Sequence, residues 1–443
     1  MGIERRPSHT SLQADYMLLV FAFFFSFFYR VSASVVLPGL GAEWGLSASS
    51  IGFVSGLYFW VYSLSQPFAG LLNDRFGPTL VAAVGLAVAA IGAVSFATAS
   101  SVIGLAAGRL LTGVGLASIL SGTVAFQKAA FQPDRYAFFS GIVYFIGNLG
   151  AVASVAPLGA ALDLWGRRGV FLVLTALTVV LGLALLARRR RDPVVAGLGI
   201  AGASQRSTGG AVAPGLTAQL VVAVRTIVGT PQLAAMAVLW LVSYGALMTL
   251  QGLWGVEWCQ TAYNATASTS RIWATMVSVG VMAGNVIGSR TAPSAGRRGF
   301  AITVASIAGA GAWALLWSSM SLRAPIWFTG GACALVGAAS GACYVHLTAG
   351  VNDLSRKGQG GAVFGTINMM PSLGVIIGQW GAGAVIDRGS GLVGAAGRAY
   401  TPAAFTTAFG VILAVILASQ FLLVRIKGFE EGRPDGAGAQ PGR

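Results

Sequence analysis

The chain has 443 residues, of which 55% are hydrophobic and only 9% are charged, and its mean hydropathy is +0.75. A water-soluble protein of this size needs far more charge to cover its surface, so the composition excludes an ordinary soluble domain and predicts a membrane protein. Apolar runs of about 20 residues, the length of helix that crosses a bilayer core of about 30 Å, recur along the sequence, and their continuity excludes a barrel of short alternating strands.

The first half of the sequence predicts six membrane-spanning helices. The first of them follows a short basic tail, and no small-residue cleavage site ends it, so we interpret it as a retained helix and not as a signal peptide. The predicted spans are Tyr16–Leu40, Ile51–Asn73, Thr79–Ser100, Val102–Thr123, Tyr136–Leu162 and Gly169–Ala187.

A long polar interruption follows, from Arg188 to Pro231. It begins with the run Arg188–Arg191 and continues as a stretch rich in Gly, Ala and Ser, which is typical of a linker. Within it, Pro214–Val228 carries apolar residues at helical spacing. This spacing predicts an amphipathic helix that lies along the membrane surface.

Six further helices are predicted after the linker. Their spans are Gln232–Gly255, Ser270–Ser289, Phe300–Met320, Ala324–Leu347, Gly360–Ala384 and Ala403–Val424. The expected fold is therefore an all-α polytopic membrane protein with twelve transmembrane helices in two pseudo-symmetric six-helix bundles. The bundles cover residues 16–187 and 232–424, the linker covers 188–231, and tails of residues 1–15 and 425–443 flank them.

The basic residues predict the orientation in the membrane. With both tails in the cytoplasm, 20 Lys and Arg residues fall on the cytoplasmic side and 6 on the opposite side, while Arg30 and Arg109 fall inside predicted helices. This excess follows the positive-inside rule. The net charge of +15 is then explained by contact with anionic lipid headgroups, and its dispersal over many short loops argues against nucleic-acid binding.

A loop motif lies between the second and third predicted helices and reads Gly70-Leu-Leu-Asn-Asp74-Arg75-Phe-Gly77-Pro78. Gly70 would allow close helix packing and Gly77 a tight turn, while the Asp74 carboxylate could accept helix-terminal amides or an arginine. A contact of Asp74 that forms in one conformation and breaks in another would act as a gate. The alternative is that Asp74 and Arg75 only tie off the turn.

This loop closely resembles the G-x-L-x-D-R-x-G motif of the major facilitator superfamily of transporters. The segment Arg109–Ala117 reads R-L-L-T-G-V-G-L-A, similar to the superfamily pattern R-x-x-x-G-x-G-x-A in the same helix, and Ala156–Ala160 reads A-P-L-G-A, a degraded form of an antiporter motif. The resemblance covers residues 16–424 and implies a solute transporter in the inner membrane. The opening Phe28-Tyr29-Arg30 with Pro38, and the segment Gln251–Trp254, look like a poorly characterised bacterial branch of the superfamily. It does not give the substrate.

The second half carries a weaker counterpart of the loop motif. Gly284–Arg290 and Gly296–Arg298 keep its glycines and basic residues, but no acid stands where Asp74 stands in the first half. Any latch at this loop must therefore differ from that of the first half.

Two arginines fall within predicted helices, where charge is costly and usually functional. Arg30 lies about 14 residues into the first helix and Arg109 about 7 residues into the fourth from the opposite side, or roughly 21 Å and 10 Å. In a core of about 30 Å these depths nearly coincide. None of the 13 acidic residues falls in the central part of a predicted helix, so an anionic cargo could supply the missing charge. The alternative is that each arginine bonds backbone carbonyls and hydroxyls, such as those of Ser26 and Ser34.

Aromatic and amide residues at inner positions could complete a binding cavity with the two arginines. They are Tyr58, Tyr62, Tyr144, Asn148, Tyr244, Gln251 and Asn368. Each of them alone could instead serve helix packing. Together they predict a moderately polar, aromatic-lined substrate site.

Proton coupling has two candidate carriers. His346 lies near the cytoplasmic end of the tenth predicted helix, where an imidazole can titrate close to neutrality, although a satisfied interfacial histidine is the alternative. Glu257 lies at the outer end of the seventh helix, beside Trp254 and Trp258.

The sequence contains no metal-ligand cluster, no nucleotide-binding loop and no nucleophile with a plausible base. We therefore expect neither an enzyme nor a bound cofactor. The leading hypothesis is a monomeric secondary transporter of a small organic anion, either carboxylate or phosphate, driven by a gradient or by exchange, with the small molecule, protons and lipid as partners. A drug-type proton antiporter and a non-transporting membrane sensor or scaffold are the alternatives, and the direction of transport stays open.

Overall fold

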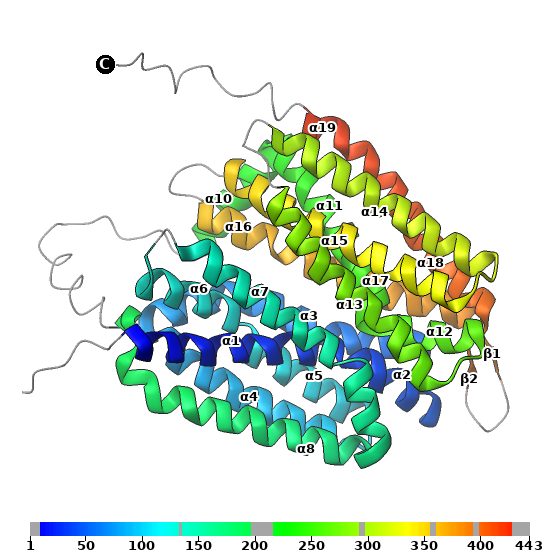
Figure 1. Ribbon diagram of the computed structural model, residues 1–443, viewed down its shortest axis with the longest axis horizontal. Coiled ribbons are helices and arrows are strands. Elements are labelled where there is room, and N and C mark those ends of the chain that lie inside the picture. The colour runs from blue at the N-terminus through cyan, green and yellow to red at the C-terminus, as the bar shows by residue number, and fades with distance from the viewer. Residues whose placement is uncertain are drawn as a thin grey trace, which may run out of the picture.

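The computed structural model of the chain describes residues 9–132, 135–195, 216–291, 297–354, 360–392 and 398–427. Figure 1 shows these residues as two bundles of long helices, one coloured blue to green and the other green to red. The bundles converge at one end and diverge toward the other.

The first bundle contains eight helical elements. They are α1 (His9–Val31), α2 (Ala33–Glu43), α3 (Ala48–Phe76), α4 (Pro78–Thr98), α5 (Val102–Leu116), α6 (Ile119–Ala130), α7 (Tyr136–Ala153) and α8 (Ala156–Arg188). The 3-10 turn η2 (Arg189–Arg191) and helix α10 (Leu216–Gly229) belong to the linker.

The second bundle begins with helix α11 (Pro231–Thr249), which continues through the π-helical turn η3 (Leu250–Trp254) into α12 (Gly255–Tyr263). Its remaining helices are α13 (Ala267–Arg290), α14 (Arg298–Ser321), α15 (Ile326–Leu354), α16 (Gly360–Ile367), α17 (Met369–Gly389), α18 (Pro402–Ser419), the 3-10 turn η6 (Gln420–Leu422) and α19 (Leu423–Lys427). Two-residue strands β1 (Gly391–Leu392) and β2 (Arg398–Ala399) pair antiparallel between α17 and α18.

The apex is the end at which α2, α12 and the β1–β2 hairpin lie, and the base is the end at which α1 begins and α19 ends (Figure 1). The two bundles converge at the apex.

Capping residues and prolines mark the starts of the helices. Side-chain oxygens accept the backbone N–H three residues later at Ser47, Ser101, Thr266 and Thr401, which precede α3, α5, α13 and α18. These contacts satisfy amides that the first turn of a helix leaves unpaired. Proline opens α4, α11 and α18, where its missing N–H costs nothing.

The described residues contain twelve membrane-spanning segments. Ten helical segments are long and apolar enough to cross a bilayer, and Phe138–Ala153 is a shorter apolar helix. The 29-residue helix α3 supplies the remaining span. The predicted all-α fold of two six-helix bundles is therefore confirmed.

A glycine separates the fifth span from the sixth. Gly166 has a φ of 66° within the segment assigned to α8, a left-handed conformation that costs glycine little. The chain kinks at this residue. The end of the predicted fifth span therefore lies before Gly166 and the sixth span after it.

The first helix begins earlier than the sequence predicted. Asp15 was assigned to the tail of residues 1–15, but α1 starts at His9 and the Asp15 side chain is buried. Its Oδ1 atom accepts a hydrogen bond of 2.8 Å from Arg188 Nη1 at the end of α8. An ion pair with an opposite charge makes this burial tolerable, and single-sequence periodicity did not reveal that pairing.

The linker forms the predicted helix within its described part. Helix α10 packs against α11 and α16 of the second bundle, and its residue Ala223 is fully buried. These contacts were not expected of a helix predicted to lie only on the membrane surface. Residues 196–215 of the linker lie outside the described residues.

The two bundles meet most extensively along α3 and α17, which run antiparallel. A Cβ atom added to Gly52 would collide with the backbone of Gln379, and one added to Gly383 would collide with the backbone of Ala48. Glycine at these positions lets the two helices approach closely, as small residues do in membranes. These closest contacts involve the first turns of α3, so the tight part of the interface lies at the apex.

Candidate functional site

A cavity lies between the two bundles. The space between its atoms amounts to ≈ 900 Å³, which includes open solvent at its mouth. The first bundle lines it with Phe23, Phe27, Arg30, Phe59, Tyr62, Leu120, Tyr144 and Asn148. The second bundle lines it with Trp240, Ser243, Tyr244, Leu247, Val281, Asn285, Ser340, Gly341, Tyr344, Asn368, Pro371 and Ser372.

Arg30 is the one charged side chain among the described residues that line this cavity. It is 7% exposed, and its Nη1 atom donates a hydrogen bond of 2.9 Å to the Tyr244 hydroxyl. Its Nε atom is buried without a partner among the described residues, and none of their carboxylates lies within 4.0 Å of it. A buried guanidinium with an unused donor and no counter-ion is costly. An anion bound in the cavity would relieve that cost.

Arg109 has a different environment, although it is equally buried. Its Nη1 atom donates to the Tyr29 carbonyl at 2.7 Å and its Nη2 atom to the Ser55 carbonyl at 3.0 Å. Its Nε atom has no partner in the described part of the chain, and the residue does not line the cavity. Arg109 therefore ties α5 to α1 and α3, which is the backbone-bonding alternative considered for both arginines.

Two tyrosines on α3 stack between the two arginines. The rings of Tyr58 and Tyr62 lie 5.8 Å apart with an interplanar angle of 16°. The Arg109 Cζ atom is 4.9 Å from the Tyr58 centroid, and the Arg30 Cζ atom is 4.9 Å from the Tyr62 centroid. Cations are attracted to such ring faces. The two stacked tyrosines hold both guanidinium groups in place, and of the two arginines only Arg30 lines the cavity.

The structure brings six of the nine predicted substrate-site residues to the cavity wall. They are Arg30, Tyr62, Tyr144, Asn148, Tyr244 and Asn368. The other three are buried in helix packing: Tyr58 donates to the Ser26 carbonyl, Arg109 bonds the backbone, and Gln251 Nε2 donates to Ser278 Oγ at 2.7 Å. A role of the six in binding stays a prediction.

Several residues of the cavity wall were not predicted from the sequence. Trp240 and Tyr344 meet edge to face with centroids 5.3 Å apart, and the Tyr344 ring lies 6.4 Å from that of Tyr144 across the bundle interface. Asn285 also lines the wall, and its Oδ1 atom is buried without a described donor. An amide in the middle of an apolar helix was the available signal for Asn285, but it was read only as part of the loop motif.

An aspartate of the second bundle caps a helix of the first at the apex. Asp387, near the end of α17, accepts the backbone N–H of Ala48 at 2.8 Å and that of Ser49 at 2.9 Å, together with the Ser49 hydroxyl. These amides open helix α3. A carboxylate at a helix N-terminus is stabilised by the unpaired amides and by the helix dipole, so Asp387 fastens the two bundles together.

A second polar contact between the bundles lies at the same end of the molecule, on a different pair of helices. Arg271 near the start of α13 makes two hydrogen bonds to the Asp163 carboxylate at the far end of the fifth span, 2.5 Å from Nη1 and 3.2 Å from Nη2. Two parallel bonds of this kind are geometrically specific. This pair also holds the bundles together at the apex.

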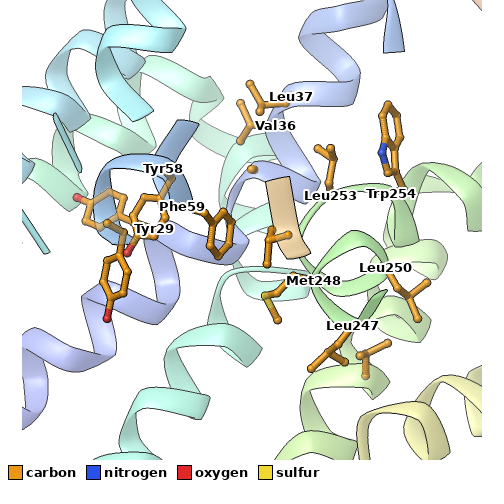
Figure 2. Close-up of a cluster of buried hydrophobic side chains, with 14 of the residues drawn as sticks. Tyr29, Val36, Leu37, Tyr58, Phe59, Leu247, Met248, Leu250, Leu253 and Trp254 are labelled. Atoms are coloured by element: carbon orange, nitrogen blue, oxygen red, sulfur yellow. The ribbon is translucent and has the colours of Figure 1, made fainter. Parts of the chain in front are cut away.

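Apolar side chains fill the space between these polar contacts and the cavity. Figure 2 shows Val36 and Leu37 of α2 and Tyr29, Tyr58 and Phe59 of the first bundle grouped with side chains of α11 and η3. Those from the second bundle are Leu247, Met248, Leu250, Leu253 and Trp254. Helix α2 packs directly against η3. The cavity is therefore sealed from the apex.

The ion pairs on the base side run within single bundles. Arg188 pairs with Asp15 inside the first bundle, and Arg298 Nε donates to Asp353 at 3.0 Å inside the second. Among the described residues, no ion pair joins the two bundles on this side. Among the residues that the structure describes, the ion pair between the bundles therefore lies at the apex. Asp353 also supplies an acid for the second-half loop, from α15 instead of from the loop itself.

The first-half loop motif is only partly engaged in this conformation. Gly77 ends α3 with a φ of 84°, as expected for a tight turn that needs glycine. Asp74 and Arg75 are exposed, and no partner for the Asp74 carboxylate exists among the described residues. A Cβ atom added to Gly70 would meet nothing within 4 Å, so the close packing expected of Gly70 is absent here.

Another aspartate performs the capping expected of Asp74. Asp192, directly after the arginine run, is buried, and its Oδ2 atom accepts the Thr79 N–H at 2.8 Å and the Thr79 hydroxyl at 2.7 Å. These contacts cap the start of α4. No local sequence pattern reveals this role of Asp192, because it lies 113 residues from the Thr79 amide and hydroxyl that it binds.

The two proton-coupling candidates lie away from the cavity wall. His346 is 4% exposed and lines a groove formed by α13, α14 and α15. Its Nδ1 atom has no partner in the described part of the chain. Glu257 lies half-buried on α12 at the apex. Neither side chain lines the cavity that contains Arg30, so their role stays a prediction.

Two six-helix bundles with a cavity between them define a polytopic membrane transporter. Residues 19–379 match the family model of the Major Facilitator Superfamily. Because this match covers most of the chain, the protein belongs to that superfamily.

Known proteins support this assignment. A segment of 165 residues is 30% identical to a probable sulfoacetate transporter of Cupriavidus necator, covering 37% of this chain and 38% of the relative. A segment of 203 residues is 23% identical to a probable hexose phosphate transport protein of Chlamydia pneumoniae, covering 44% and 43%. The chain therefore spans less than half the length of these curated relatives. The structure of a bacterial homologue of the human lysosomal transporter Spinster, in an inward-facing and unoccupied conformation, has a TM-score of 0.72 at 14% identity, covering 97% of this chain and 100% of that one.

Proposed function

We propose that the protein is a secondary active transporter of a small organic anion, which moves its cargo by alternating access between the two bundles. The observation that carries this proposal is the buried Arg30, which faces the cavity with an unused Nε donor and no described counter-ion. A carboxylate or phosphate could accept two parallel bonds from the guanidinium fork. Cargo binding would then neutralise a charge that no described carboxylate pairs with.

The relatives support an anionic cargo. Sulfoacetate and hexose phosphate, which appear in the names of two of them, are both anions. The low identity and the partial coverage do not transfer either substrate to this chain. The shared feature that we infer is the sign of the cargo's charge.

The pattern of contacts supports alternating access. The bundles are fastened at the apex by Asp387 and by the Asp163–Arg271 pair. If the base lies in the cytoplasm, as the basic residues predict, this conformation is inward-facing. Opening the apex would require both contacts to break, and Asp74 at the base would then gain a partner in the opposite state.

The proposed location is a bacterial inner membrane with both ends of the chain in the cytoplasm. A cysteine introduced at Ala203, in the linker outside the described residues, provides the test. We expect a membrane-impermeant maleimide to label it in inverted vesicles and not in intact cells. Labelling in intact cells would overturn the topology.

Transport is proposed to be coupled to protons, with Glu257 as the carrier. Glu257 lies in the first turn of α12, a helix that packs against α2 at the apex, the end that opens and closes in this scheme. Its protonation would therefore change with the state of the apex. His346 lines the groove formed by α13, α14 and α15, outside the cavity that contains Arg30. This position disfavours His346 as the proton carrier.

Reconstitution tests the proposed function directly. Proteoliposomes with the wild-type chain should accumulate labelled sulfoacetate, para-hydroxyphenylacetate or glucose phosphate faster than protein-free liposomes, and an inwardly directed proton gradient should increase the rate. The exposed Arg168→Ala variant should match the wild type, while Arg30→Met should lose uptake. Uptake of a cation such as tyramine, with no anion transported, would refute the proposal and favour the drug-antiporter alternative.

A further inference from the structure

The residues of the cavity wall limit the number of negative charges on the cargo as well as their sign. Arg30 is the one cationic residue among its described lining residues, and the other polar groups are neutral amides and hydroxyls. A second negative charge on the cargo would therefore face no cation and would be desolvated without compensation. This arrangement disfavours dianions, including sugar phosphates and sulfonated carboxylates.

Most of the remaining wall is aromatic. Phe27 lies against Arg30, with the Cζ atom 4.6 Å from the ring centroid, and Phe23 packs edge to face on Phe27 at 4.9 Å. On the opposite bundle, Trp240 and Tyr344 form an edge-to-face pair. Rings on both sides of the cavity favour a flat apolar body between them, because offset and edge-to-face ring contacts add to the gain from apolar burial. A small polyhydroxylated cargo would leave its hydroxyl groups against these rings.

A separate polar group lies on the second bundle. Asn285 on α13 lines the cavity, and its side-chain oxygen Oδ1 is buried and has no described hydrogen-bond donor. Gly341 on α15 lies directly against Asn285, since a Cβ atom added there would meet its backbone nitrogen and its Oδ1 atom. A buried acceptor without a donor destabilises the protein, and a hydrogen bond from the cargo would remove that cost. Arg30 and Asn285 therefore offer opposite polarities from opposite bundles.

We propose that the cavity selects organic monoanions with an aromatic or similarly flat apolar body and a hydrogen-bond donor at the end remote from the anion. In this arrangement the anionic group of the cargo binds Arg30, and its ring lies between Phe27 and the Trp240–Tyr344 pair. The hydrogen-bond donor at its other end binds the side-chain oxygen of Asn285. The inference rests on the proposed function and narrows it to a hydroxylated aromatic acid. It also gives the cargo a contact with both bundles.

Matched probes test this inference by isothermal titration on the purified full-length protein in nanodiscs. The probes are para-hydroxyphenylacetate, phenylacetate, tyramine, sulfoacetate and glucose phosphate. We expect para-hydroxyphenylacetate to bind at least tenfold more tightly than sulfoacetate or glucose phosphate, and several-fold more tightly than phenylacetate. The Asn285→Leu variant should abolish the preference for the hydroxylated acid and leave phenylacetate binding within twofold of the wild type.

The outcomes separate this inference from the proposed function. If sulfoacetate or glucose phosphate binds more tightly than both aromatic acids and depends on Arg30, the aromatic inference fails while the anion transporter stands. If neither aromatic acid binds up to its solubility limit, the inference also fails. If tyramine binds more tightly than every anion, both fail. An unchanged preference for the hydroxylated acid in a folded Asn285→Leu protein would refute the role of Asn285, and a folded Asn285→Gln protein that retains the preference would support it.

Discussion

The guanidinium of Arg30 in the first bundle donates a hydrogen bond of 2.9 Å to the Tyr244 hydroxyl in the second. It is a direct polar contact between the bundles at the cavity itself, because both residues line that cavity. An anion that binds Arg30 can also accept a hydrogen bond from the Tyr244 hydroxyl. Cargo binding would therefore replace a contact between the bundles with one that passes through the cargo.

Replacing Tyr244 with phenylalanine should remove this contact and keep the ring. Hydrogen bonds to charged groups contribute roughly 1.5–3 kcal/mol net, so Tyr244→Phe should lower the thermal stability of the unliganded protein. Anion affinity should fall less than in Arg30→Met, since the guanidinium remains. Thermal unfolding and titration of the same preparation check both effects. An unliganded protein as stable as the wild type would contradict the assigned contact.

Arg109→Met should behave as a structural variant. It removes two charge-assisted hydrogen bonds, to the Tyr29 and Ser55 carbonyls, and such bonds contribute roughly 1.5–3 kcal/mol net each. We expect a clear loss of stability with little change in the preference for anionic over neutral ligands. The measurement compares the affinities of para-hydroxyphenylacetate and its neutral amide in folded material. A loss of the anion preference equal to that of Arg30→Met would restore a joint role for the two arginines.

The helices and their grouping were predictable from the sequence because lipid imposes long apolar spans and places basic residues on one side. Contacts between segments far apart in the chain were not. Asp15 was assigned to a tail because no local pattern shows that Arg188 lies beside it. Asp192 caps α4 across 113 residues, which single-sequence periodicity cannot detect.

The candidate site was predictable in part for the same reason. Arg30 stood out because charge inside a span is rare, but depth alone did not separate it from Arg109. What separates them is the direction that each side chain takes from its helix, which depends on packing. Tyr344 carried no distinctive local signal, and the amide of Asn285 within an apolar helix did not show which way it faces; the fold brings both to the cavity wall.

Asp387→Asn should loosen the apex. The carboxylate now accepts two backbone amides and a hydroxyl at the start of α3, and a neutral amide loses the favourable interaction with the helix dipole. A Leu37→Cys reporter, in a chain whose three buried native cysteines are replaced by alanine, should then react faster with an impermeant maleimide from the apex side. The Asp353→Asn substitution, within one bundle, is the matched control. Equal labelling in the two variants would contradict the role of Asp387 in holding the bundles together at the apex.

Asp74→Asn should affect the opposite end state from Asp387→Asn. Asp74 has no described partner in this conformation, so its contact is expected in the other end state, and a change there biases the equilibrium without touching the cavity. We expect slower transport, unchanged or lower labelling of the Leu37→Cys reporter, and cargo affinity in the base-open state within about threefold of the wild type. Normal turnover together with weakened binding would refute a gating role.

The central claim is that Arg30 binds the anionic group of the cargo, and one titration series tests it most directly. The more tightly bound of sulfoacetate and para-hydroxyphenylacetate is titrated into the wild type, Arg30→Lys, Arg30→Met and the exposed control Arg168→Ala, each checked for folding by size-exclusion elution. Loss of a bidentate contact of roughly 1.5–3 kcal/mol predicts a Kd that rises by about ten- to a hundredfold in Arg30→Met. Arg30→Lys should recover only part of this loss, because a point charge replaces a planar fork, and Arg168→Ala should match the wild type. A folded Arg30→Met protein that binds the anion as tightly as the wild type would contradict the account.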